Sequence, residues 1–184
     1  VQTPNSLRGH VAVDGGQTSV NPFGIDTQDG AWHHVFMTWD GGDLVLYFDG
    51  EEVDRDSSQS GDVVHSDRSL FVGYGDNGYT SYYDMDGAID EVRLYDRALG
   101  SDEVLALFEN DTTTDSGGSG DSGSDGSDGS DGSDGSETSD PSTAPTPVAR
   151  WEFAETSGTV IADSAGGNDA MVRGSPVLDA EGVF

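Results

Sequence analysis

The segment Gly87–Leu99, GAIDEVRLYDRAL, carries the most informative pattern in the sequence. Its apolar positions change phase midway. Val92 and Leu94 keep the period of two expected of a strand with one buried face, whereas Ile89 lies three residues before Val92. A β-bulge between Ile89 and Val92 would reconcile the two halves. The stretch therefore predicts an irregular closing strand at the edge of a sheet.

Asp90 and Glu91 occupy the predicted bulge. A bulge re-aims side chains, so both carboxylates would face one spot, where their oxygens suit a hard cation such as calcium. The alternative is that both acids are solvated, because carboxylates lie mostly at protein surfaces. The two residues alone leave both interpretations open.

A second segment, Ala31–Gly50, reads AWHHVFMTWDGGDLVLYFDG and predicts a hairpin. Trp32–Trp39 carries apolar residues on both faces, which predicts a central strand buried on both sides. A Gly-Gly turn then leads to Leu44–Phe48, whose alternate positions form a core face. Glu51–Asp56 is polar and is expected to pair back on the solvent side.

Together, Ala31–Gly50 and Gly87–Leu99 resemble the C-terminal half of a laminin G-like jelly-roll domain, one of the concanavalin A-like lectin folds. The segment Ala149–Phe184 begins ARWEFAETSGTVIADSAGGNDA and resembles the first strands of the same domain type. The resemblance implies an all-β fold: an antiparallel jelly-roll β-sandwich with one short C-terminal helix, followed by a disordered linker and a partial second sandwich.

The predicted domain boundaries follow the composition. Residues 1–110 are interpreted as the C-terminal part of one laminin G-like domain, ending in a helix from Ser101, its N-cap, to about Glu109. Residues 111–147 are acidic and rich in Ser, Asp and Gly, which predicts a disordered linker. Residues 148–184 are interpreted as the N-terminal part of a second such domain.

The two incomplete halves are expected to complete each other. In a jelly roll of this type the first strand lies next to the last, so the strand within Gly87–Tyr95 would otherwise be an open edge. We therefore predict that Ala149–Phe153 folds back onto it, like a domain swap within one chain, and that this brings Asp163 toward Asp90.

The resemblance also implies a structural calcium ion, held where a loop near the domain start meets the closing strand. Asp163 and Asn168 match the loop, and Asp90 and Glu91 match the strand. These four residues are the predicted metal ligands, and Ca²⁺ is the predicted cofactor.

The charge balance limits the partners. The chain has 36 Asp and Glu residues, 7 Arg, no Lys and no Cys, with a formal net charge of -29. Such a surface repels nucleic acid and anionic membranes. The acid excess is typical of proteins from halophiles, where molar salt screens self-repulsion. No apolar run is long enough for membrane insertion. We expect an extracellular or cell-surface protein, from a halophilic organism.

One loop offers groups that suit a sugar. The candidate ligand-binding residues are Asp76, Asn77, Tyr79, Tyr82 and Tyr83, which supply carboxylate, amide and aromatic faces for hydrogen bonding and stacking. The alternative is that they are ordinary turn and strand residues.

Catalysis is not expected. Glycosidases with a similar jelly roll carry a Glu-x-Asp-x-x-Glu strand, which Asp84–Glu91, DMDGAIDE, does not match. The sequence also has no Lys for a phosphate-binding P-loop and no Gly-x-Ser-x-Gly nucleophile elbow.

The leading interpretation is a non-catalytic extracellular recognition module that binds a glycan or a cell-surface protein, supported by structural calcium. Neighbouring laminin G-like domains in the same longer chain would be further partners. The alternatives are an architectural spacer or adhesin repeat without a ligand site, and an accessory domain of a secreted hydrolase. Fold alone does not choose among them.

Overall fold

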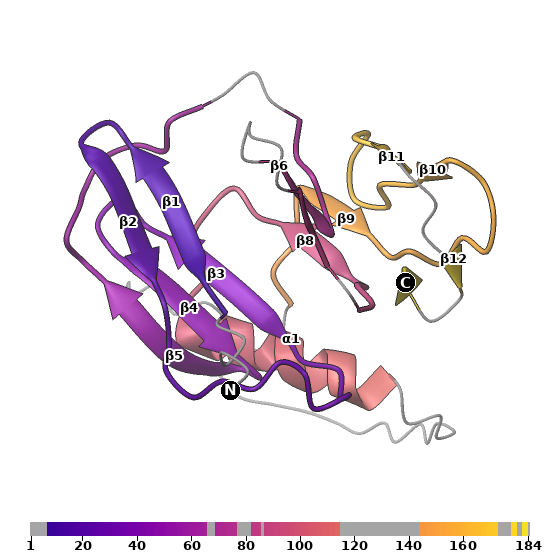
Figure 1. Cartoon of the computed structure of the whole chain (residues 1–184), viewed down its shortest axis with the longest axis horizontal. Helices are drawn as coiled ribbons and strands as arrows, with labels where there is room; N and C mark the ends of the chain where they lie inside the picture. The colour runs from indigo at the N-terminus through magenta and orange to yellow at the C-terminus, as the bar shows by residue number, and fades with distance from the viewer. Residues whose placement is uncertain are drawn as a thin grey trace, which may run out of the picture. The chain divides into compact units, whose positions relative to one another are not determined.

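The computed structural model describes residues 7–65, 69–76, 82–85, 87–114, 144–172, 178–179 and 182–183. The chain divides into two compact units (Figure 1). Unit 1 comprises Val1–Val11, Gly15–Ser60 and Leu99–Pro145, and unit 2 comprises Ala12–Asp14, Gly61–Ala98 and Thr146–Phe184. Apart from one helix, the regular elements of the described residues are short strands in sheets, which confirms the all-β prediction.

The main sheet of unit 1 has three antiparallel strands in the order β3–β4–β5: β3 (Val35–Trp39), β4 (Leu44–Phe48) and β5 (Glu51–Asp56). Asp49 and Gly50 join β4 to β5, with φ values of 51° and 81°. Two successive positive φ values are typical of a type I′ turn, for which Asp-Gly is a preferred sequence. The turn sets the register in which Phe48 pairs with Glu51.

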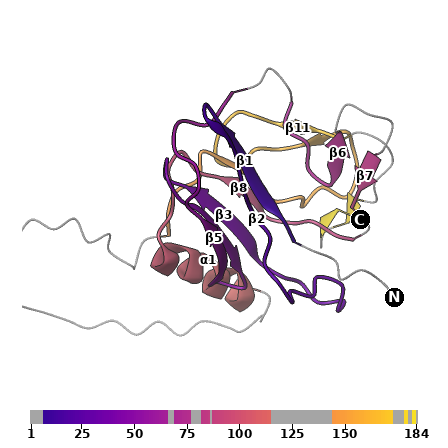
Figure 2. The ribbon, with the colours of Figure 1, turned by 60° about the vertical axis from the view of Figure 1, so that its left-hand side comes forward.

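A two-stranded sheet of β1 (Gly9–Val13) and β2 (Gly16–Val20) covers the main sheet of unit 1 (Figure 2). Val20, Leu44 and Leu46 form the buried cluster between them. Full burial of each such side chain contributes about 1.5–3 kcal/mol. A hydrogen bond also joins β2 to β5: the backbone N–H of Ser19 donates to Asp56 Oδ2 at 3.2 Å.

The helix α1 (Ser101–Thr114) packs against β5 and the turn before it. Gly100 is its N-cap, one residue earlier than predicted: the Gly100 carbonyl accepts the N–H of Val104, and Glu103 accepts the N–H of Gly100. The helix also runs to Thr114, past residue 111 where the linker was predicted to begin, because no Gly or Pro interrupts it there.

The position of β3 differs from its prediction as a central strand buried on both sides. Within the described part of the sheet β3 is an edge strand, and the side chains of Val35 and Met37 are 46% and 44% exposed. The central strand is β4, in which Leu44 through Tyr47 are all buried. Apolar residues on both faces indicate burial, but they do not fix the order of strands in a sheet.

Unit 2 is built from paired short strands. Its strands are β6 (Tyr74–Asp76), β7 (Tyr82–Asp84), β8 (Val92–Leu94), β9 (Ala149–Trp151), β10 (Val160–Ile161), β11 (Ala170–Met171), β12 (Leu178–Asp179) and β13 (Gly182–Val183). They pair antiparallel as β6–β7, β8–β9, β10–β11 and β12–β13. Three of these pairs join neighbours in sequence, whereas β8–β9 joins residues from opposite sides of α1.

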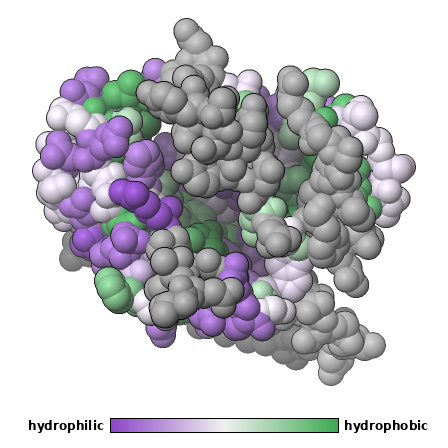
Figure 3. All heavy atoms as spheres, viewed as in Figure 1, coloured by the Kyte–Doolittle hydropathy of each residue, from purple (hydrophilic) through white to green (hydrophobic). Residues whose placement is uncertain are grey.

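Hydrophilic side chains (purple) are spread over much of the described surface that is visible in Figure 3. Hydrophobic side chains (green) show between them in several places. Phe23 is a fully exposed hydrophobic residue. The residues drawn in grey include most of the predicted linker, residues 115–143, which lies outside the described residues.

Candidate functional site

The predicted fold-back of the C-terminal segment is confirmed. β9 pairs antiparallel with β8 in the register Val92 to Trp151, Arg93 to Arg150 and Leu94 to Ala149. The N–H of Val148 donates to the Leu94 carbonyl at 2.8 Å and extends the pairing. The edge of β8 that was predicted to be open is therefore paired with β9.

An apolar cluster anchors this pairing from one side. Trp151 is 6% exposed and is packed with Ala149, Phe153 and Ile161, and Val92 of β8 packs against the same cluster. The indole N–H of Trp151 donates to the Asn168 carbonyl at 3.0 Å, so its polar atom is satisfied as it is buried.

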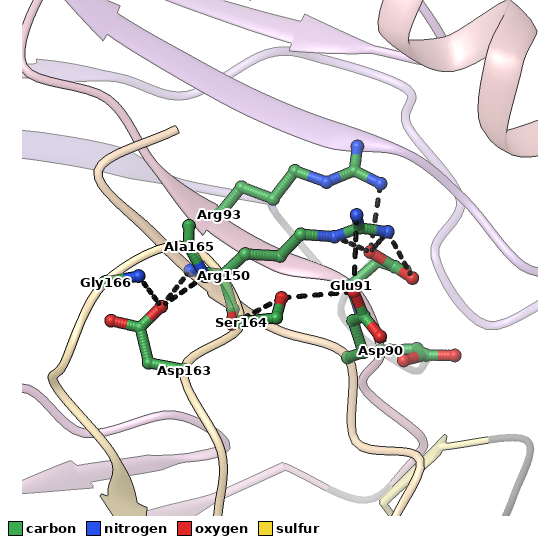
Figure 4. Close-up of polar contacts among 9 residues, drawn as sticks. Asp90, Glu91, Arg93, Arg150, Asp163, Ser164, Ala165 and Gly166 are labelled. Atoms are coloured by element: carbon green, nitrogen blue, oxygen red, sulfur yellow. Dashed lines mark hydrogen bonds and ion pairs between the residues drawn. The ribbon is translucent and has the colours of Figure 1, made fainter. Parts of the chain in front are cut away.

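Two arginines hold Glu91 directly before β8 (Figure 4). Arg150 binds the carboxylate with both arms: Nε donates to Oε2 at 3.0 Å and Nη2 to Oε1 at 3.1 Å. Arg93 Nη2 donates to Oε2 at 2.9 Å. These contacts with Glu91 raise the pKa of Arg150. Paired arms give geometric specificity as well as attraction.

The phase change in Gly87–Leu99 has its backbone counterpart at Glu91. Its φ is 52°, in the left-handed region that residues other than glycine rarely adopt. The strand β8 begins at the next residue. The predicted irregularity is therefore present at Glu91, and it directs the carboxylate to the guanidinium groups.

Asp163 organises the loop that follows β10. Its Oδ1 accepts the N–H groups of Arg150, Ala165 and Gly166 at 2.8, 3.1 and 3.0 Å (Figure 4). Its Oδ2 accepts the N–H of Asn168 at 3.0 Å. These donors, that of Arg150 above all, hold the pKa of Asp163 far below its usual range.

The four predicted metal ligands have different hydrogen-bond partners in the structure. Glu91 faces two guanidinium groups, whereas Asp163 faces backbone amides of its own loop (Figure 4). Asn168 donates from both its N–H and its side-chain amide to Asp163, and Asp90 accepts the N–H of Glu91. Calcium needs six to eight oxygen ligands, so the calcium site that the resemblance implies stays a prediction.

Among the residues that the structure describes, no three His, Asp or Glu side chains are arranged to hold a metal ion. Within the same ranges, no helix combines the length and the apolar character that crossing a bilayer requires.

The candidate sugar loop lies at the β6–β7 hairpin. The register pairs Asp76 with Tyr82 and Gly75 with Tyr83. Asn77 and Tyr79 lie outside the described residues, in the connection between these strands. Three of the five predicted residues are thus placed by the backbone at the end of one hairpin.

Sequence reasoning missed the arginines that hold Glu91. The sequence contains a signal for them. The chain has only seven Lys and Arg residues, and two of these, Arg93 and Arg150, lie in the two strands that were predicted to pair. It also missed a clamp in unit 1, where His33 lies between Asp49 Oδ2 at 2.9 Å and Asp29 Oδ1 at 3.1 Å. Both carboxylates raise the pKa of His33, Asp49 the more strongly.

Part of this chain matches a known protein family. A family profile, Laminin_G_3, described as the concanavalin A-like lectin/glucanases superfamily, matches residues 1–105. No match was found among curated proteins.

One solved structure is similar, the S-layer domain-containing protein (residues 221–444) from Clostridium thermocellum, with 28% sequence identity and a TM-score of 0.39. The match covers 50% of this chain and 46% of that one, so this chain spans about half the length of that structure. The family match, which includes β3, β4 and β8, is the broader result, and on it the chain belongs to the laminin G-like family of the concanavalin A-like lectin/glucanases superfamily.

Proposed function

We propose that this chain is a non-catalytic recognition module that binds carbohydrate at the β6–β7 hairpin. The observation that carries the proposal is the register of the hairpin, in which Asp76 stands opposite Tyr82. Directly opposite residues of an antiparallel pair share one face of the sheet. The backbone therefore brings a residue with a carboxylate and a residue with an aromatic ring to paired positions of the hairpin.

The chemistry of the connecting residues suits a sugar. Asn77 and Tyr79 add an amide and a second aromatic ring between the strands, and Tyr83 follows in β7. Sugar hydroxyls need paired donors and acceptors, and the apolar face of a pyranose needs a flat partner. The superfamily that this chain belongs to includes lectins by its description, which supports the same class of ligand.

Two observations support the non-catalytic part of the proposal. A glycosidase needs a carboxylic acid with a raised pKa beside a second carboxylate. Here Glu91 is paired with two guanidinium groups, and the pKa of Asp163 is lowered by backbone N–H donors. Neither group is suited to protonate a leaving group.

We place the module outside the cell or on its surface, in keeping with its acidity and its lectin-type family. No step of the proposed recognition depends on calcium. Calcium binding therefore stays a prediction from the sequence, to be tested separately.

A glycan array probed with the full chain in molar salt tests the proposal. We expect a defined set of bound glycans, and a loss of binding of roughly tenfold or more for Tyr82→Ala, because an aromatic contact at the centre of a site dominates its affinity. Arms with added Ca²⁺ and with a chelator show whether the ion takes part.

The matched control is Phe23→Ala, which removes a fully exposed aromatic side chain of unit 1 and should leave every glycan signal unchanged. An empty array for the folded wild-type chain would overturn the proposal and favour the spacer function. Equal losses for Tyr82→Ala and Phe23→Ala would show that the signal comes from nonspecific aromatic contacts.

A further inference from the structure

The β8–β9 pairing joins two segments that are far apart in the sequence. The strands are linked through residues 95–148, which include α1 of unit 1 and then residues 115–143. The latter segment is made of Ser, Gly, Asp, Thr, Glu and Pro, so its sequence contains no aliphatic or aromatic side chain suited to a core. No contact between β8 and β9 therefore requires that both strands come from one chain.

The contact has the features of a specific interface. On its apolar side, Trp151 and Phe153 are buried with Ile89 and Val92 packed against them. On its polar side, Arg150 binds Glu91 with both arms. Burial of aromatic anchors together with a paired carboxylate and guanidinium is typical of protein recognition sites.

We propose that residues 146–172, the donor segment, can complete the β8 edge of a second copy of this chain. Each copy carries one donor segment and one acceptor edge. Reciprocal exchange then closes a two-fold dimer, whereas one-way exchange links copies in a row. The partner is thus another molecule of the same protein, recognised through the strand register and the charges of Glu91 and Arg150.

Concentration and salt control the balance between the two forms. Within one chain the donor segment is present at an effective concentration of about a millimolar, so pairing within the chain dominates in dilute solution. The net charge of -29 opposes association of two copies at low salt. In about 1 M salt the screening length falls to about 3 Å, which removes most of that repulsion. Exchange therefore increases with protein concentration and with salt.

A cysteine experiment tests the pairing directly, because the native chain has no Cys. Leu94 and Ala149 are paired residues, whose Cα atoms in an antiparallel pair lie within the range that a disulfide spans. One full-length chain carries Leu94→Cys and another carries Ala149→Cys. They are unfolded together, refolded at high concentration in molar salt and then oxidised.

The expected product is a disulfide-linked heterodimer, whose yield falls when the chains are refolded dilute. A chain with both substitutions, refolded dilute, should form the disulfide within itself. The matched control replaces Ala149→Cys by Val160→Cys, an exposed position of the same donor segment that pairs with β11, and should give little heterodimer. Equal yields with the control, or no heterodimer at any concentration, would overturn the proposal.

Charge complementation provides a second test. In Arg150→Glu, the introduced carboxylate faces the carboxylate of Glu91. In Glu91→Arg, the introduced guanidinium faces that of Arg150. A mixture of the two restores an opposite-charge pair in both interfaces of an exchanged dimer. We expect roughly tenfold more heterodimer in the mixture than dimer in either variant alone, measured by light scattering after chromatography, because two charge pairs are restored at once. Equal amounts would contradict exchange through β8 and β9.

Discussion

Unit 1 builds its main sheet from neighbours in sequence, whereas unit 2 depends on a strand pair that joins residues from opposite sides of α1. In unit 1, β3, β4 and β5 follow one another through short turns. In unit 2, β8 and β9 meet only after a long stretch of chain has been closed. Closing a long loop costs conformational entropy that short turns do not.

The two units also differ in what holds them. The core of unit 1 is aliphatic, formed by Val20, Leu44 and Leu46. Unit 2 joins its segments with an aromatic anchor, an ion-paired carboxylate and a carboxylate that accepts several N–H groups. The comparison indicates that a contact between distant segments is made specific by polar groups, while a local hairpin is specified by its turn. The following predictions test this difference.

The largest effect is expected from Trp151→Ala. It removes the aromatic anchor of the cluster and leaves the Asn168 carbonyl without its indole donor, which should lower the free energy of unfolding of unit 2 by about 3–5 kcal/mol. Hydrogen exchange in molar salt measures it: amides of β8 should lose protection while those of β4 keep it.

The counterpart in unit 1 is Leu46→Ala, expected to cost about 2–5 kcal/mol. This variant should remove protection from β4 while β8 keeps its own. If both variants weakened both strands equally, the division into two units would be wrong. Phe23→Ala serves as the neutral control, because its side chain is fully exposed.

Gly50→Ala should have the next largest effect. Gly50 has a φ of 81°, and an added Cβ would lie 3.0 Å from Leu105 and Phe108 of α1. Strain at positive φ together with overpacking should destabilise unit 1 by about 2–3 kcal/mol. Chemical unfolding followed by the loss of helical circular dichroism measures it.

Gly41→Ala is the matched control for this variant, because Gly41 also has a positive φ, of 98°, but nothing within 4 Å of an added Cβ. It should lower the free energy of unfolding by about 1 kcal/mol, the cost of the backbone strain alone. A cost for Gly50→Ala no greater than this would mean that the helix does not pack on the turn.

Gly166→Ala probes the amide-bound carboxylate of unit 2. An added Cβ would lie 2.8 Å from Asp163 Oδ2 and 2.8 Å from the Val148 carbonyl, so the loop must shift. We expect the free energy of unfolding of unit 2 to fall by about 1–3 kcal/mol. The neighbouring Gly167→Ala has open space around its Cβ and should be nearly neutral in the same thermal unfolding experiment. Equal melting temperatures for the two variants would contradict the packing of this loop.

The smallest effect is the pH dependence contributed by His33. Asp49 and Asp29 raise its pKa above the ordinary value of 6.5, because both carboxylates stabilise the protonated ring. Its contribution to stability is therefore fully present below about pH 6.5 and is lost as pH rises through the raised value of the folded state. The melting temperature of unit 1 in molar salt, followed from pH 5.5 to 8.5, should show this decrease.

His33→Gln should remove this part of the pH dependence. His10→Gln, which replaces a histidine of β1, should leave it in place. A wild-type melting temperature that is equally high on both sides of this pH range would show that the clamp adds no stability.

Local elements, and the pairing of the two segments, could be predicted from the residues alone. The Asp-Gly turn specified the β4–β5 hairpin, because two positive φ values are required there. The phase change around Glu91 located an irregularity that the backbone contains. The shared family pattern indicated that Ala149–Phe153 would fold back onto the closing strand, and Ala149–Trp151 pairs with it.

The partners of the polar groups and the order of the strands depend on tertiary contacts that local sequence does not specify. An acidic side chain near a turn can bind a cation, an arginine or backbone N–H groups. Which of these it binds depends on the residues that distant parts of the sequence place beside it. Glu91 receives Arg150 across β8–β9, whereas Asp163 receives N–H groups of its own loop and of Arg150. Likewise β3 became an edge strand, because alternation in one strand records burial but not which neighbours supply it.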